Sequence, residues 1–243
     1  MSDEMARKVS IVTGAAGGIG GFISQALAKA GATVVLASRN QEALEQKAQE
    51  IHTFGGSTLV VPTDLADEES IKNLVKTTEV EYGRLDVLVN CAGVHPHVGP
   101  LEDTETRYWD QCMTINARAP FLLCRESIPL LRKSDGARII NISSVVGVKG
   151  YSHQAEYTAS KHALRGMSMA LAEELRVDGI RVHVVCPGGV RTPLVSSVRP
   201  DIKVEDLILP EEVAELVLYL ASHQGNAVVD ELHIRRATAA PWF

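Results

Sequence analysis

Three side chains that could take part in proton transfer follow one another in the second half of the chain. Ser144 stands at the end of an apolar run, Tyr157 follows thirteen residues later, and Lys161 four residues after that. The segment 155–177 has the pattern of a helix, which would place Tyr157 and Lys161 one turn apart on the same face. An ammonium group beside a phenol stabilises the phenolate, so we expect Lys161 to lower the pKa of Tyr157 toward the range that a proton carrier needs. A tyrosine and a lysine at this spacing are also common on helices without a catalytic role.

A glycine-rich run near the N-terminus could bind a phosphate. Residues 13–20 read Thr-Gly-Ala-Ala-Gly-Gly-Ile-Gly and stand between an apolar run and a helical one. The N-terminus of a helix presents unpaired amide donors to an anion, and glycines let a diphosphate approach the backbone. The spacing of Gly14, Gly18 and Gly20 differs from the GxGxxG fingerprint, because Ile23 stands where the third glycine would fall. The alternative is a tight turn between strand and helix with no ligand.

A polar pair stands about twenty residues past these glycines, where dinucleotide-binding proteins usually carry an acidic residue for the ribose 2′-hydroxyl. Here the pair is Ser38 and Arg39. A guanidinium suits a 2′-phosphate, and a cation near the start of a helix is unfavourable unless an anion binds beside it. We therefore predict NADP(H) as the cofactor. The alternative is a solvated arginine at a helix start.

The composition limits the functions that the chain can have. Its 243 residues suit one α/β domain, and 45% hydrophobic with 22% charged residues is typical of a globular protein. The formal net charge of −6 and the aromatic content of 5% argue against a nucleic-acid partner. The N-terminus is acidic where a signal peptide is basic, and no apolar window is long enough to span a membrane. We therefore expect a cytoplasmic protein with no membrane partner.

The cysteines and histidines do not form a recognisable metal-binding pattern. No two of the four cysteines are two residues apart, so neither a CxxC redox pair nor a zinc ribbon is present, and reduced thiols are expected. His95 and His97 are close in sequence but lack a third ligand at a fixed distance. We assign them to a pocket wall or a solvated loop and predict that the chain binds no metal.

Short apolar runs alternate with longer amphipathic segments along the whole chain. The apolar runs are rich in valine and isoleucine, which is typical of strands buried on both faces of a parallel sheet. The alternation predicts a doubly wound parallel sheet, a Rossmann-like α/β fold of seven strands in a single domain over residues 1–243. The irregular stretch at about 194–209 is predicted to be a short substrate lid. The expected strands are 9–12, 33–37, 58–61, 85–89, 138–142, 181–186 and 228–234, and the expected helices are 18–30, 40–54, 67–82, 104–133, 155–177 and 210–222.

Together these motifs resemble those of the short-chain dehydrogenase/reductase family, in the family's order and at its spacings over nearly the full chain. Gly14, Gly18, Ile19 and Gly20 are similar to its TGxxxGxG loop. The run Asn90, Cys91, Ala92, Gly93 is similar to its NNAG motif, with Cys91 in place of the second asparagine, a departure expected to affect packing more than chemistry. Asp64 and Leu65 fall at the aspartate motif that contacts the adenine, and Pro187, Gly188, Val190 and Thr192 fall in the loop that binds the nicotinamide carboxamide. Asp64 could instead cap the following helix.

The resemblance also implies a catalytic set. Asn116, Ser144, Tyr157 and Lys161 fall at the family's catalytic asparagine, serine, tyrosine and lysine. In the implied mechanism Tyr157 is the general acid or base for a carbonyl or alcohol, and Ser144 stabilises the charge on its oxygen. Lys161 binds the nicotinamide ribose and lowers the pKa of Tyr157, and Asn116 holds a water beside the lysine. Tyr157 and Lys161 therefore also contact the cofactor, and the alternative for Asn116 is an ordinary helix residue.

The substrate is less defined than the reaction. We expect His95, Val146, His153 and Gln154 to lie in the substrate pocket, because they neighbour the tyrosine or the strand-end loops. The short lid favours a small ketone, aldehyde or hydroxy acid, although an open site for a bulky ketone is the alternative. The C-terminal part also departs from the family, because Arg235 and Arg236 stand near the place of its glycine pair.

Two other functions fit parts of this pattern. A 3-oxoacyl-[acyl-carrier-protein] reductase is the alternative enzyme, although its acidic partner would need a basic docking patch. A sensor that binds NADP(H) without catalysis would have no use for Tyr157 and Lys161.

Assembly into a homotetramer or a dimer is implied by the family resemblance, through the helices at 155–177 and 104–133. The first of these helices carries a stripe of small residues, and the alternative for this stripe is contact with the chain's own sheet. Its members are Ala155, Ala159, Ala163, Gly166 and Ala170. The apolar tail Pro241, Trp242 and Phe243 is expected to pack on a neighbouring subunit.

Overall fold

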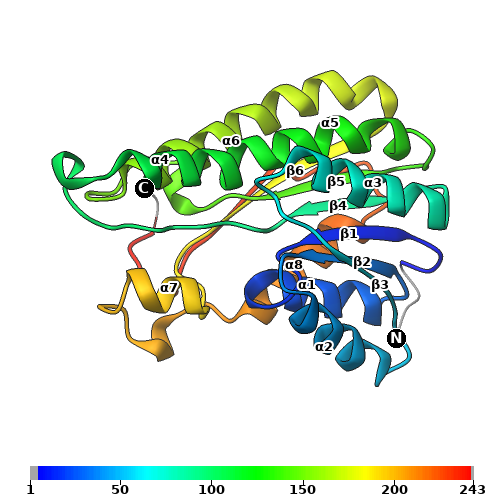
Figure 1. The fold of residues 1–243 in the computed structure, drawn as a ribbon, viewed down its shortest axis with the longest axis horizontal. Coiled ribbons are helices and arrows are strands. Elements are labelled where there is room, and N and C mark those ends of the chain that lie inside the picture. The colour runs from blue at the N-terminus through cyan, green and yellow to red at the C-terminus, as the bar shows by residue number, and fades with distance from the viewer. Residues whose placement is uncertain (1–4, 242–243) are drawn as a thin grey trace.

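Seven parallel strands form the central sheet of the molecule (Figure 1). The structure is a computed structural model, and it describes residues 5–241 of the chain. The strands are hydrogen-bonded in the order β3-β2-β1-β4-β5-β6-β7, which confirms the predicted doubly wound, Rossmann-like fold. Their bounds are β1 Val9–Thr13, β2 Thr33–Ser38, β3 Ser57–Pro62, β4 Val87–Asn90, β5 Arg138–Ile142, β6 Arg181–Pro187 and β7 Glu231–Ile234.

Helices cover both faces of this sheet (Figure 1). One layer contains α1 (Gly18–Lys29), α2 (Gln41–His52) and α8 (Pro210–Ser222). The opposite layer contains α3 (Glu68–Tyr82), α4 (Thr106–Met113), α5 (Ala119–Leu131) and α6 (Ala155–Leu175). Among the described residues, none of the helices is both long and apolar enough to cross a membrane.

Two hydrophobic cores lie on the two faces of the sheet. Successive strand residues point to opposite faces, and in β1 Ile11 belongs to the core under α3 and α5 while Val12 belongs to the core under α1 and α8. Leu88 and Val89 of β4 divide in the same way, and all four side chains are completely buried. Burial on both faces explains why the strands read as continuous apolar runs rather than as alternating ones.

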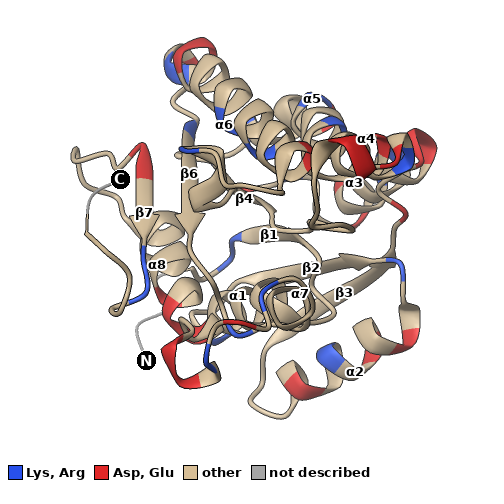
Figure 2. Ribbon diagram, turned by 90° about the vertical axis from the view of Figure 1, so that its left-hand side faces the viewer, with Lys and Arg blue, Asp and Glu red and all other residues tan. Residues whose placement is uncertain are grey.

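Charged residues of both signs lie on the outer helices, where ion pairs link neighbouring elements (Figure 2). Glu68 of α3 pairs with Arg125 of α5 at 2.8 Å and with Arg118 at 2.9 Å. Glu79 of α3 pairs with Lys133, which follows α5, at 3.0 Å. Exposed ion pairs of this kind each contribute little to the free energy of unfolding. We therefore assign them a role in the relative orientation of the helices rather than in the stability of the fold.

The long helix predicted over 104–133 is interrupted. A π-helical turn at Thr114–Arg118 separates α4 from α5. Asn116 lies within this turn, is completely buried, and is hydrogen-bonded to both backbone polar groups of Val94 in the loop after β4. A widened turn is the common way to insert such a contact into a helix, and the contact is between residues too far apart in sequence for periodicity to reveal.

The segment around the predicted lid at about 194–209 contains a short helix, α7 (Pro193–Val198). Thr192 caps it, because its Oγ1 accepts a hydrogen bond from the Val195 amide at 3.3 Å, and Pro193 occupies the first helical position where no amide donor is needed. The predicted seventh strand is shorter than 228–234 and covers only Glu231–Ile234. Of the apolar tail, Trp242 and Phe243 lie outside the described residues.

Candidate active site

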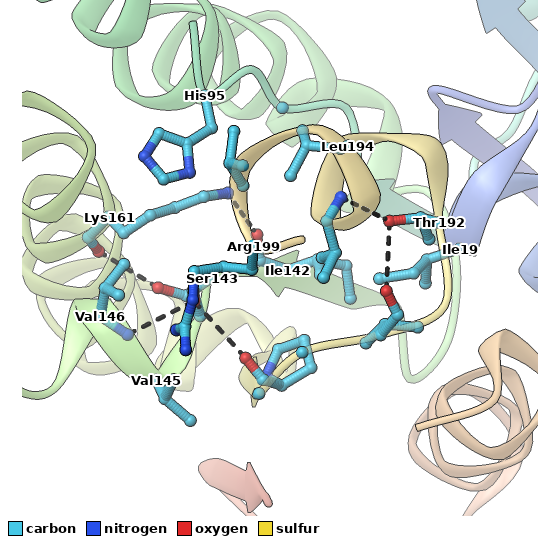
Figure 3. Close-up of a pocket in the computed structure, with 18 of the residues that line it drawn as sticks. Ile19, His95, Ile142, Ser143, Val145, Val146, Lys161, Thr192, Leu194 and Arg199 are labelled. Atoms are coloured by element: carbon cyan, nitrogen blue, oxygen red, sulfur yellow. Dashed lines mark hydrogen bonds between the residues drawn. The ribbon is translucent and has the colours of Figure 1, made fainter. Parts of the chain in front are cut away.

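A cavity of about 460 Å³ lies where the central strands of the sheet end at their carboxyl side. Its walls come from the loops after β1, β4, β5 and β6 and from the start of α6 (Figure 3). The strand order reverses between β1 and β4, and open α/β sheets bind their ligands at such a crevice. The predicted site residues that line it are Gly14, Gly18, Ile19, Gly20, Ala92, Gly93, His95, Ser144, Val146, Gln154, Tyr157, Lys161, Pro187, Gly188, Val190 and Thr192.

The glycine loop forms one end of this cavity. Gly14 has a φ of +70°, and a Cβ atom there would lie 3.1 Å from the Cα of Ala92. A Cβ atom on Gly20 would lie 2.5 Å from the carbonyl oxygen of Gly14, closer than real Cβ contacts allow. The chain can therefore make this turn only with glycine at both positions. Helix α1 starts at Gly18, and Gly17 before it has no side chain to cap the first amides, which remain available to an anion.

Ser38 and Arg39 lie beside the glycine loop at the end of β2. The Ala15 amide donates a hydrogen bond to the Ala37 carbonyl at 3.3 Å, which fixes the two segments next to each other. The hydroxyl of Ser38 is buried without a hydrogen-bond partner among residues 5–241, which is costly unless a ligand satisfies it. Arg39 is exposed, and neither residue lines the cavity itself.

Ser144 and Tyr157 meet at the other end of the cavity. The Ser144 hydroxyl follows β5, donates to the Pro187 carbonyl at 3.4 Å and accepts from the Val146 amide at 3.3 Å. It also lies close enough to Tyr157 to act on the pKa of its phenol. His95 stacks on the Tyr157 ring with centroids 4.1 Å apart and planes 9° from parallel. The structure therefore brings a hydroxyl and a phenol together on the cavity wall.

The two histidines after β4 have different aromatic partners. His95 stacks on Tyr157, whereas His97 stacks on Tyr108 at 5.0 Å. Burial lowers the pKa of His95 to about 4, so its ring is neutral at physiological pH. His95 thus forms a flat, uncharged wall beside the phenol.

The pKa of Tyr157 differs from the sequence-based expectation. Burial raises it to about 12, and the hydrogen bond with Ser144 opposes this shift without overcoming it. The Lys161 amine lies 5.8 Å from the centre of the tyrosine ring and donates to the Ile142 carbonyl at 2.9 Å (Figure 3). The predicted lowering by Lys161 was wrong for this structure, because desolvation dominates and the amine is directed to the backbone.

Burial also acts on Lys161, whose side chain is enclosed by the cavity and the sheet. It lowers the pKa of the amine to about 8, while the nearby thiols act in the opposite direction. The amine therefore changes its charge close to neutral pH, which is the behaviour expected of a group that responds to a charged ligand.

Replacing Lys161 with methionine is expected to raise the free energy of unfolding at pH 7. The folded pKa of about 8 lies below that of an unfolded lysine, so the charged amine destabilises the folded state fully below pH 8. The lowering corresponds to about 3 kcal/mol, and it disappears as the pH rises toward the unfolded pKa near 10.4. Urea unfolding at pH 7 and at about pH 10 measures this difference. Equal stability of the two proteins at pH 7 would contradict the prediction.

Asn116 supports the site from behind the cavity wall. Its Oδ1 accepts from the Val94 amide at 2.8 Å, and its Nδ2 donates to the Val94 carbonyl at 2.8 Å and to the Ser160 hydroxyl at 3.0 Å. Its Oδ1 and the Lys161 Nζ each lie 3.4 Å from the place of a Cβ on Gly93. Asn116 therefore joins the loop after β4 to α6 next to Lys161.

Other predicted site residues do not reach the cavity. Asn90 donates to the Asn141 side chain at 2.8 Å and so links β4 to β5 within the buried sheet. Asp64 is exposed and accepts from the Ala66 amide at 2.9 Å, while Leu65 is buried in a hydrophobic core. Helix α3 is capped by Asp67 rather than by Asp64. His153 is exposed, although the neighbouring Gln154 is buried and lines the cavity.

Several cavity residues were missing from the predicted site. Leu194, Val195, Val198, Arg199 and Ile202 come from the segment predicted as a lid. The irregular sequence of this segment indicated a lid, but it did not show which of its side chains line the cavity. Lys149 and Tyr151 come from the loop before α6, and Arg235 and Arg236 from the segment after β7, where the departure from the family's glycine pair was the only sign in the sequence.

Known proteins resemble the chain in sequence and in structure. Residues 8–203 match the family model described as short chain dehydrogenase. The chain is 33% identical over 231 residues to a 3beta-hydroxysteroid dehydrogenase of Mediterraneibacter gnavus, covering 95% of this chain and 83% of that protein. It is 32% identical over 237 residues to a cis-4-hydroxycyclohexanecarboxylate dehydrogenase of Sinomonas cyclohexanicum, covering 94% of this chain and 95% of that protein.

The crystal structure of a metagenomic short-chain oxidoreductase in complex with NADP is similar over 96% of this chain and 99% of that chain. Its TM-score is 0.84 at 35% sequence identity.

Proposed function

The chain belongs to the short-chain dehydrogenase family of oxidoreductases, and we propose that it transfers a hydride between NADP(H) and a secondary alcohol or carbonyl compound, with Tyr157 as the general acid and base. The observation that carries this proposal is that one cavity is lined by the glycine loop at one end and by Ser144 and Tyr157 at the other. A nicotinamide dinucleotide is the elongated ligand whose phosphates and reactive ring match these two ends.

The residues around the cavity fit such a cofactor. The uncapped start of α1 and the tight Gly14–Gly20 turn suit a diphosphate, and the unsatisfied Ser38 hydroxyl suits a ribose or its phosphate. We propose that Lys161 holds the second ribose and that Pro187, Gly188, Val190 and Thr192, which line the same cavity, surround the nicotinamide. When bound, the nicotinamide supplies or accepts the hydride. Asp64 and Leu65 remain proposed neighbours of the adenine.

Tyr157 moves the proton that must accompany the hydride. With a pKa of about 12 its phenol is protonated at neutral pH, so it is ready to donate to the oxygen of a carbonyl substrate. In the reverse direction it takes the proton of the alcohol. Ser144 donates a hydrogen bond to the same oxygen and stabilises its negative charge, and Asn116 holds the loop and helix that position Lys161.

Arg39 is proposed to select NADP(H) over NAD(H). Replacing Arg39 with alanine is expected to lower the preference for NADPH by about tenfold or more, because a charged hydrogen bond to the 2′-phosphate contributes roughly 1.5–3 kcal/mol. Measuring kcat/KM for both cofactors in both proteins gives the ratio directly. The NADH values should stay unchanged and serve as the internal control, and an unchanged ratio would remove Arg39 from the cofactor site.

The segment 194–209 is proposed to be the substrate lid. Leu194, Val198 and Ile202 give it apolar side chains on the cavity wall, and Val146, Gln154 and His95 line the same cavity. The relatives named above act on a hydroxysteroid and on a hydroxycyclohexanecarboxylate, both of which carry an alcohol on a ring. This supports a secondary alcohol or the matching ketone as the reacting group.

A panel of ketones, aldehydes and secondary alcohols tests the reaction class. The absorbance of NADPH should fall when NADPH is supplied with carbonyl compounds and should rise when NADP is supplied with alcohols, in both cases at a rate proportional to enzyme. Binding of NADPH without turnover of any member of a broad panel would contradict the proposed enzyme and favour a sensor.

Assembly through α4, α5 and α6 is also proposed. These helices lie together on one side of the sheet (Figure 1), and they expose Trp109 by 44%, Phe121 by 50% and Met169 by 58%. The small residues Ala163, Gly166 and Ala170 of α6 are exposed rather than packed on the sheet. An apolar surface of this kind favours a dimer or tetramer, whose mass sedimentation equilibrium would measure.

A further inference from the structure

The charge of the cavity is opposite to that of the chain. Five cationic side chains line it, namely Lys149, Lys161, Arg199, Arg235 and Arg236, and none of its described lining residues is an aspartate or a glutamate. The whole chain contains 24 basic and 30 acidic residues, so the excess of cations in the cavity lining is opposite to the excess of acidic residues in the chain. A cleft lined by one sign of charge concentrates ligands of the other sign.

The cofactor alone does not account for these cations. The proposed diphosphate site is the glycine loop at one end of the cavity, and the proposed 2′-phosphate ligand Arg39 lies outside the lining. Lys161 belongs to the proposed chemistry. The other four cations come from the loop before α6, from the end of α7 in the proposed substrate lid, and from the segment after β7.

Arg199 is the best placed of the four to bind an anion directly. It follows α7, and its side chain is 35% exposed on the cavity wall (Figure 3). Its Nε and Nη2 hold the Asp201 carboxylate at 2.8 and 2.7 Å, which leaves Nη1 without a hydrogen-bond partner among residues 5–241. The guanidinium is also close enough to Tyr151 for the two side chains to interact electrostatically.

Asp201 does not neutralise the arginines around it. Its carboxylate is 62% exposed, lies outside the cavity lining, and interacts with Arg236 as well as with Arg199. The Arg236 side chain runs over Gly189, with its Cδ 3.6 Å from the place of a Cβ there. Figure 2 shows the basic stretch directly after β7 that contains Arg235 and Arg236. One solvated carboxylate is thus shared by two guanidinium groups, and the rim keeps a positive charge.

Lys149 adds a further cation to the substrate end. Its amine lies 5.2 Å from the centre of the Tyr151 ring, in the same loop that Arg199 approaches. This loop leads directly to Gln154 and to the start of α6, where Tyr157 lies. Cationic side chains from two separate elements therefore lie near Tyr151, on the wall of the cavity that Tyr157 also lines.

We propose that the substrate is an acid: a small hydroxy or keto compound whose carboxylate binds Arg199, with Lys149 and Arg236 contributing electrostatic attraction. This inference rests on the proposed function and adds the substrate class. A guanidinium binds a carboxylate through directed, charge-assisted hydrogen bonds, which would fix the distance between the acid group and the carbonyl at Tyr157. Arg199 is then a specificity-determining residue that touches the substrate but not the reacting atoms.

Matched pairs of substrates test the inference. Suitable probes are acetoacetate with acetoacetamide and 4-oxopentanoate with 4-oxopentanamide, because each pair differs only in the charge of the acid group. In the wild-type protein with NADPH, kcat/KM should be at least tenfold higher for the acid of one pair, and the advantage should shrink with added salt. Turnover that is equal for acid and amide in both pairs would overturn the acid class and leave the proposed reaction standing.

Variants assign the effect to Arg199. Arg199→Ala should raise KM for the acid by about ten- to a hundredfold and leave the amide unchanged, and Arg199→Lys should fall between, because it keeps the charge without the planar fork. Asp201→Asn removes the negative charge that competes for the guanidinium and should lower KM for the acid. Arg176→Ala, an exposed arginine outside the cavity lining, is the matched control and should change neither substrate. Equal losses for acid and amide in Arg199→Ala would show a structural role and contradict the inference.

Binding distinguishes failure of this inference from failure of the proposed function. If neither member of a pair is reduced, thermal unfolding of the NADPH-loaded protein with 4-oxopentanoate or 4-oxopentanamide still gives an answer. Stabilisation by the acid alone, lost in Arg199→Ala, would support the anion site and contradict only the proposed reaction. Equal effects of both compounds would overturn the anion site.

Discussion

Replacing Tyr157 with phenylalanine is expected to lower kcat by about a hundred- to ten-thousandfold, which is the range that a general acid or base supplies. The change removes only the phenolic oxygen. The ring that stacks on His95 at 4.1 Å remains, so the fold and the cavity wall should be kept. NADPH binding, measured by fluorescence, and the thermal unfolding temperature should therefore stay close to those of the wild type.

The rates of the two directions of the reaction should depend on pH in opposite ways, which gives a second test of the role of Tyr157. Because the pKa of Tyr157 is raised to about 12, carbonyl reduction should remain fast up to a pH well above neutral, whereas alcohol oxidation should become faster as the pH rises. The phenylalanine variant should lose this opposite pH dependence along with its turnover. A variant that kept more than about a tenth of the wild-type kcat would show that another group carries the proton.

Replacing Ser144 with alanine is expected to lower kcat by about a hundred- to a thousandfold, because one donor to a developing oxyanion typically contributes that much. The hydroxyl is held in place by the Val146 amide and the Pro187 carbonyl, so it meets the substrate oxygen without a large loss of entropy. The loss should appear in kcat with little change in KM, because the interaction strengthens only as charge builds.

A serine close in sequence provides the control. Ser152 is exposed in the turn before α6 and lies outside the cavity lining, so Ser152→Ala should leave both kcat and KM unchanged. Ser144→Ala should also remove the side-chain hydrogen bond that opposes the raised pKa of Tyr157. Near-normal kcat in Ser144→Ala would exclude an oxyanion role for this hydroxyl.

The strands and the glycine loop could be predicted because local signals determine them. Burial on both faces makes β1 and β4 continuous apolar runs, and close packing of backbone against backbone requires glycine at Gly14 and Gly20. The sheet order then brings the loops after β1, β4, β5 and β6 to one edge. This explains why most of the predicted cofactor residues line one cavity.

The features that the sequence did not reveal depend on contacts between distant residues. The π-helical turn contains Asn116, whose side chain binds the backbone of Val94, and no periodicity marks that contact. The pKa of Tyr157 depends on how deeply the ring is buried, and burial of a phenol outweighs one hydrogen bond. Arg199 and Arg236 lie 37 positions apart and share a wall only because the chain returns over Gly189 after β7.

That return has a consequence for synthesis. The Gly188 amide donates to the Ile234 carbonyl at 2.7 Å, which holds the end of β7 against a loop some fifty residues earlier in the chain. The Arg235 guanidinium donates to the carbonyls of Arg236, Ala237 and Ala239 and so holds the turn after β7 in place. A nascent chain on the ribosome can complete six strands and still lack this wall. The cavity is therefore complete only after residues 231–240 have been synthesised and have folded back over the earlier loop.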